Sequence, residues 1–199
     1  AFVVSLLDEL VADYRQWEIE RLVVGPPLAG APPPGNHGPA TQPSPEASAV
    51  AKAMADKTAG RPSAGPTGFA GLFWQYDVRD AMEESISGSR TKKNIRPTIN
   101  SYMFGNAQAI AAIARLANRP ALAEEFAAKA ATLRRLTQNT LWNAGAKFIE
   151  VRLEDGAFAG VREAIGFIPW YFKLPEFGRG YEVAWAQLTD EQGFRAPFG

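Results

Sequence analysis

Two long segments with helical periodicity, separated by a short link, constrain the fold of this chain most. Residues 98–117 carry small apolar residues at helical spacing, and residues 120–142 carry larger ones. Such a link predicts an antiparallel helical hairpin. Asn118 is a candidate N-cap of the second helix, and Pro120 suits its first turn. The expected seam sets Ala107, Ala111 and Ala114 of the first helix against Phe126, Ala130 and Leu133 of the second.

The rest of the chain divides into a helix, a loop-like segment and a further helical region. Within residues 1–24, an amphipathic helix is predicted over 2–22, whose apolar positions are Val3, Leu6, Leu7, Leu10, Val11, Tyr14 and Trp17. Residues 25–68 hold ten of the 15 prolines and are predicted to be an insertion or linker that stays disordered. In 69–199, residues 147–153 alternate like a strand, 154–156 signal a turn, and 181–188 begin another helix. The predicted class is mainly α with short β excursions.

Composition excludes several classes of function. Lys plus Arg and Asp plus Glu are both 21, so no net charge draws the chain to nucleic acid or an anionic membrane. With no cysteine and only His37, no metal site based on thiolates or several histidines is expected. No apolar run reaches the roughly 20 residues of a membrane span. The compartment stays open, with a slight preference for the cytoplasm, and so does the oligomeric state.

Four carboxylates within eight residues form the candidate chemical centre: Asp77, Asp80, Glu83 and Glu84. On a helix, Asp80 shares a face with Glu83 or Glu84, and such like charges persist where solvent, a cation or a ligand compensates them. The plain alternative is a solvated helix start, where acids are favoured near the positive end. Aromatic and fork-like polar side chains flank the cluster, as sugar sites require: Trp74, Tyr76, Arg96, Asn100 and Tyr102.

Residues 71–86, GLFWQYDVRDAMEESI, and residues 96–103, RPTINSYM, resemble the six-hairpin glycosidases. The nearest group comprises the bacterial mannosylglycerate hydrolase-like and family sixty-three α-glucosidase-like enzymes. Residues 167–170, 181–184 and 193–199 are similar to that group as well, so the resemblance covers about 69–199 and weakly the first helix. It implies a partial (α/α) six-hairpin toroid, an inverting mechanism, an α-linked glucoside or mannoside as the substrate, and no cofactor.

The resemblance also implies roles for particular residues. The family's general acid lies in a motif of small residue, Met or Trp, Asp, any residue and Ser, which falls on residues 81–85, AMEES. Glu83 then takes the acid's position, although Glu replaces Asp and Ala replaces Gly, so Asp80 is the second candidate. The implied substrate contacts are Trp74, Tyr76 and Trp170 as platforms, and Asp77, Arg79, Arg96, Asn100 and Tyr102 as hydroxyl ligands.

The family's general base lies further along than this chain extends. We therefore expect the 199 residues to be a fragment of the catalytic domain that is inactive on its own. Two other interpretations remain open: a non-catalytic toroid that binds a glycan or a protein, and a structural helical domain whose acids only start a helix. A carboxylate motif downstream of Gly199 would favour the enzyme.

Overall fold

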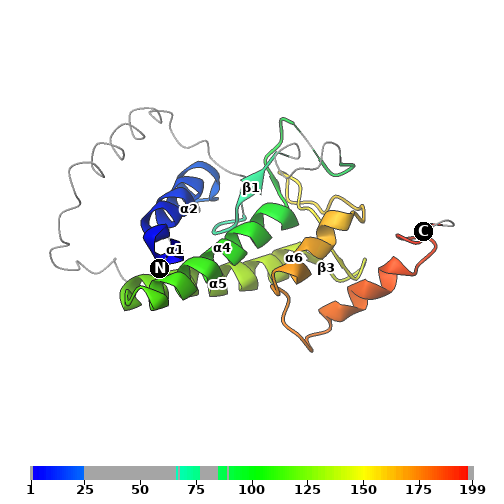
Figure 1. Ribbon diagram of the computed structural model, residues 1–199. Helices are drawn as coiled ribbons and strands as arrows, with labels where there is room; N and C mark the ends of the chain where they lie inside the picture. Colours follow the sequence, from blue (N-terminus) through cyan, green and yellow to red (C-terminus); the bar gives the residue numbers. More distant parts are fainter. Residues whose placement is uncertain (1, 25–65, 67, 77–84, 89, 197–199) are drawn as a thin grey trace, which may run out of the picture.

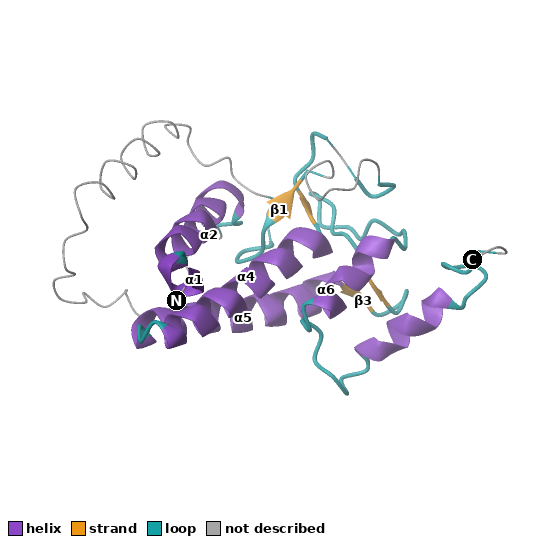
Figure 2. Ribbon diagram, viewed as in Figure 1, coloured by secondary structure: helices purple, strands orange, loops and turns teal. Residues whose placement is uncertain are grey.

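The computed structural model describes residues 2–24, 66, 68–76, 85–88 and 90–196 (Figure 1). These residues are mainly helical with a few short strands, which confirms the predicted fold class (Figure 2). The prediction of disorder for 25–68 falls almost entirely outside them. The helices are α1 (Phe2–Ser5), α2 (Leu7–Arg21), α4 (Pro97–Leu116), α5 (Pro120–Leu141) and α6 (Ile168–Tyr171), with 3-10 helices η2 (Ala164–Phe167) and η3 (Tyr181–Leu188). The strands are β1 (Trp74–Gln75), β2 (Asn94–Ile95), β3 (Trp142–Asn143) and β4 (Phe148–Ile149).

The centre of the molecule is the antiparallel hairpin of α4 and α5, which lie side by side (Figure 1). Short alanine side chains on α4 let the two backbones approach closely, and larger side chains on α5 fill the seam. All six residues predicted for this seam are buried: Ala107, Ala111, Ala114, Phe126, Ala130 and Leu133. The sequence-based prediction of the hairpin is confirmed.

The short link between these helices begins with the hydrogen bonds that end α4. Asn118 has a left-handed backbone with φ 55°. Its N–H donates to the Arg115 carbonyl at 3.1 Å, and the Arg119 N–H donates to the Ala114 carbonyl at 2.8 Å. This pattern is the Schellman ending of a helix. The N-cap assignment of Asn118 was therefore wrong, since Arg119 is the N-cap of α5, whereas Pro120 does open α5.

Changing Asn118 to Val should lower the free energy of unfolding by about 1–2 kcal/mol, because a β-branched side chain crowds the left-handed backbone. Changing Asn118 to Gly should leave stability within about 0.5 kcal/mol of the wild type, because glycine adopts this conformation freely. Urea denaturation of both variants measures the difference. Equal stability of the two variants would contradict the left-handed ending of α4.

The first predicted helix is interrupted, and its apolar stripe is narrower than the sequence indicated. Leu6 separates α1 from α2, so residues 2–22 form two helices rather than one. Leu7, Val11 and Tyr14 are buried in the core, and α2 packs against α4. Val3 and Leu10 are exposed instead. Burial on this face is therefore confined to the turns of α2 that touch the hairpin.

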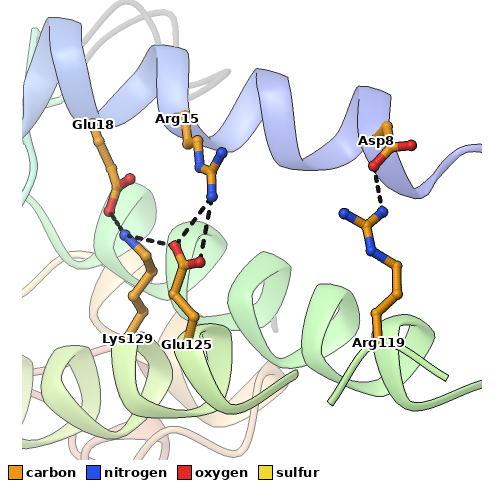
Figure 3. A network of polar contacts seen from close by, with 6 residues as sticks. All are labelled: Asp8, Arg15, Glu18, Arg119, Glu125 and Lys129. Carbon is orange, nitrogen blue, oxygen red and sulfur yellow. Dashed lines mark hydrogen bonds and ion pairs between the residues drawn. The ribbon is translucent and has the colours of Figure 1, made fainter. Parts of the chain in front are cut away.

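Ion pairs join α2 to the start and first turns of α5 (Figure 3). Arg15 contacts Glu125 at 3.3 Å, and Lys129 contacts both Glu125, at 3.8 Å, and Glu18. A separate pair joins Asp8 and Arg119. Exposed ion pairs contribute about 0–1 kcal/mol each, whereas the Lys129–Glu18 pair is partly buried. These contacts mainly orient α2, and the apolar side chains that α2 buries contribute most of its stabilisation.

Short antiparallel segments line up beside the start of α4. The Val23 N–H donates to the Leu72 carbonyl at 2.9 Å, and the Gly71 N–H donates to the Val23 carbonyl at 3.0 Å. Strand β1 then pairs with β2, and Ile95 of β2 exchanges two backbone hydrogen bonds with Arg152, at 2.8 and 3.0 Å. A further bridge joins Arg152 to Phe158. These contacts bring four distant parts of the chain to one place.

The C-terminal third follows the sequence prediction in part. The predicted strand over 147–153 is reduced to β4, which pairs with β3, and the turn at 154–156 is present with Gly156 donating to Leu153 at 2.9 Å. The helix predicted over 181–188 is a 3-10 helix. None of the helices in the described part of the chain is long and apolar enough to cross a membrane.

Candidate functional site

The candidate site is organised by β1 and β2, which are fastened to α4 by the side chain of Asn100. The Asn100 amide oxygen accepts the Phe73 N–H at 2.9 Å, and its amide nitrogen donates to the Phe73 and Arg96 carbonyls, each at 2.9 Å. The residue has no exposed surface. Because donors and acceptor all contact the chain's own backbone, Asn100 in this structure positions β1.

Trp74 on β1 is a buried ring with two cations close to it. The Arg21 guanidinium lies 4.3 Å from its ring centroid, the Lys93 ammonium lies 4.9 Å away, and Tyr76 packs edge-on at 5.3 Å. Such contacts are favourable cation–π interactions. Only 4% of Trp74 is exposed, whereas Tyr76 is half-buried. Of this predicted pair of platforms, Tyr76 therefore offers the accessible aromatic surface.

Arg96 joins β2 to the last residue of the acid motif predicted over 81–85. Its guanidinium is fully buried and donates through Nη2 to the Ser85 hydroxyl at 3.1 Å. The predicted acids Glu83 and Asp80 and the predicted contacts Asp77 and Arg79 lie outside the described residues. The structure therefore describes the residues that flank this acidic segment: those up to Tyr76 before it and those from Ser85 after it.

Residues 85–88 form a tight turn, called here the motif-exit turn, which Asn94 and Glu163 hold in addition to Arg96. The Gly88 N–H donates to the Ser85 carbonyl at 3.1 Å, which closes the turn. Asn94 donates to the Ser87 carbonyl at 3.2 Å. The Glu163 carboxylate accepts the Ile86 N–H at 2.7 Å, the Ser87 N–H at 3.3 Å, and the Ser87 hydroxyl. Neither Asn94 nor Glu163 was predicted, because no local pattern marks either residue.

Tyr102 and Trp170, the two remaining predicted contacts, lie against aromatic rings of the C-terminal third. Tyr102 on α4 packs edge-on against Phe172 at 5.6 Å. Trp170 on α6 packs against Phe167 at 6.2 Å and Trp185 at 5.5 Å. Trp185 is 43% exposed. The structure thus gathers Trp74 with Tyr76, and Arg96 with Asn100, while Trp170 belongs to an aromatic cluster around η2 and η3.

A cavity of about 410 Å³ opens beside the motif-exit turn. It is lined by Gly88, Lys92, Asn94, Leu153, Glu154 and Asp155. Lys92 and Glu154 form an ion pair across 3.7 Å, so the lining offers both donors and acceptors. A polar, neutral ligand suits such a mixed surface better than a strongly charged one.

Comparison with known proteins places the chain in a family. Residues 1–199 match the family described as the mannosylglycerate hydrolase MGH1-like glycoside hydrolase domain. A solved structure titled "Sialidase" is similar to the whole chain, with 37% identity and a TM-score of 0.72. The match covers 14% of that protein, so this chain spans about one seventh of its length. No curated protein matches the sequence significantly.

Proposed function

The chain belongs to the mannosylglycerate hydrolase MGH1-like glycoside hydrolase family, and we propose that it supplies the general acid of an inverting glycosidase for α-linked glucosides or mannosides. A carbohydrate is therefore its expected partner. The proposed acid is Glu83, with Asp80 as the alternative one helical turn earlier. The general base is expected elsewhere in the protein.

One observation supports the proposal most strongly. Arg96 is buried without any exposed surface and donates to Ser85, the last residue of the motif. Burying a guanidinium is costly, so such an arginine is retained where its hydrogen bonds fix something. Here Arg96 fixes Ser85, where the acidic segment ends, close to β2 and to the cavity beside the motif-exit turn.

The proposed mechanism uses two carboxyl groups, one as the general acid and the other as the general base. Glu83 protonates the glycosidic oxygen as the bond to the sugar breaks, and the base activates a water on the opposite face of the ring. Tyr76 and Trp170 present aromatic surface to the sugar, and Asp77 and Arg79 hold its hydroxyls. Trp74 on β1, and Arg96 and Asn100 at the start of α4, support these groups. Tyr102, which packs against Phe172, is proposed as a further contact.

The test uses the full-length protein with aryl α-glucosides and α-mannosides, and the matching β-glycosides and an aryl sialoside as comparators. We expect hydrolysis of an α-glucoside or an α-mannoside, and proton NMR should show the β-anomer as the first product. A first-formed α-anomer would contradict inversion. Hydrolysis of the sialoside alone would overturn the substrate class, and binding of a glycan without any hydrolysis would favour the non-catalytic toroid.

A further inference from the structure

We propose that Glu163 is a positioning residue of the glycosidase: it holds the motif-exit turn and thereby fixes the end of the segment that carries the acid. This inference rests on the function proposed above. Glu163 lies on the loop before η2, 76 and 77 residues away from the groups that it binds. Glu163 therefore makes a long-range contact with the motif-exit turn and is not part of the turn itself.

The contacts of Glu163 with the turn use both oxygens of its carboxylate. One oxygen accepts the backbone N–H groups of Ile86, at 2.7 Å, and Ser87, at 3.3 Å. The other oxygen accepts the Ser87 hydroxyl. Hydrogen bonds to a carboxylate are roughly twice as strong as those between neutral groups, and two backbone contacts fix direction as well as distance.

The support behind Glu163 is itself rigid. Its carbonyl accepts the Gly166 N–H at 2.8 Å, which starts η2. Gly166 packs so closely that an added Cβ would lie 2.3 Å from the Phe148 ring and 2.4 Å from the Ile149 carbonyl oxygen. The adjacent Arg162 donates to Gln187 at 2.6 Å and to the Gln192 carbonyl at 2.6 Å. The backbone that carries the Glu163 side chain is therefore held in place by its neighbours.

The motif-exit turn is held from two directions. Asn94 on β2 and Arg96 at the start of α4 hold it from one side, and Glu163 holds it from the loop before η2. The proposed acid, Glu83, precedes Ser85 by only two residues in the sequence, so we expect the position of this turn to constrain the acid. A misplacement of about 1 Å costs on the order of 10²-fold in rate, since proton transfer needs close geometry.

Glu182 provides a matched control. Its carboxylate also holds a turn, accepting the Gly178 N–H at 2.5 Å and the Gly180 N–H at 3.1 Å. Backbone hydrogen bonds, from Glu182's own N–H first and then from Gly178, hold the pKa of this carboxyl below its usual range. Glu182 thus matches Glu163 in chemistry while holding a different turn, at residues 178–182.

The experiment compares Glu163→Ala, Glu163→Gln and Glu182→Ala in the full-length protein. On a glycoside with a poor leaving group, Glu163→Ala should lower kcat about 10²-fold and change KM little. On a dinitrophenyl glycoside, which needs little protonation, the loss should be under about tenfold. Glu163→Gln should recover most of the rate, because its amide oxygen can still accept the two N–H groups. Glu182→Ala should keep wild-type kcat on both substrates.

Three outcomes would overturn the inference. If Glu163→Ala loses equal rate on both leaving groups, or if Glu182→Ala matches it, Glu163 only stabilises the fold. If the wild type hydrolyses glycosides and Glu163→Ala is as fast, the positioning role is wrong while the proposed function stands. If the wild type hydrolyses none of the glycosides, the proposed function fails first and the role of Glu163 in catalysis fails with it.

Discussion

Changing Glu83 to Gln should lower turnover of a glycoside with a poor leaving group by about 10²–10⁴-fold. The amide has nearly the shape of the acid but no proton to transfer to the departing oxygen. Substrate binding should be largely spared, so the loss should appear in kcat. The measurement is steady-state kinetics of the full-length protein with alkyl and dinitrophenyl glycosides, since the activated leaving group should lose far less.

Asp80→Asn is the paired variant, because Asp80 lies about one helical turn before Glu83. If Asp80→Asn abolishes turnover and Glu83→Gln does not, the acid is Asp80 and the motif is displaced by one turn. If neither change affects turnover, the acidic segment is only a solvated helix start. The glycosidase proposal for this chain would then lose its main chemical support.

Changing Gly166 to Ala should cost about 3 kcal/mol of unfolding free energy or more. The new methyl group would meet the Phe148 ring at 2.3 Å and the Ile149 carbonyl oxygen at 2.4 Å, and a backbone oxygen on paired β4 has little room to move. For a chain of this size the expected fall in Tm is on the order of 6–12 °C. Thermal unfolding followed by circular dichroism measures it.

Gly145→Ala is the control for this substitution. An added Cβ at Gly145 would lie 3.4 Å from the Asn143 side chain, close to ordinary contact. Its effect on the free energy of unfolding should stay within about 0.5 kcal/mol. If Gly166→Ala is as mild as Gly145→Ala, then η2 can move away from β4, and the rigid support argued for Glu163 does not exist.

The sequence predicted those features that depend on neighbouring residues. The seam of α4 and α5 could be predicted because helical periodicity and residue size both lie within one segment. The turn at 154–156 could be predicted from its Gly for the same reason. The left-handed ending at Asn118 was assigned to the wrong helix, since Asn favours both kinds of helix end.

The polar architecture of the candidate site could not be predicted in this way. Asn100 was interpreted as a sugar ligand, yet its amide contacts the backbone of Phe73, 27 residues earlier. Arg21 approaches Trp74 from α2, and Glu163 reaches the motif-exit turn from the η2 loop. Each contact joins segments that meet only once the chain has folded, and the residue types alone suit ligand binding equally well.

The pairing of Val23 with Gly71 and Leu72 bears on how this protein can vary among its relatives. Two backbone hydrogen bonds hold the chain together on both sides of residues 25–68. Between ends held in this way, the entropy of closing a flexible loop rises by only about 0.6 kcal/mol for each doubling of its length. We therefore expect changes in the length of this segment to leave β1, Arg96 and the motif-exit turn in place.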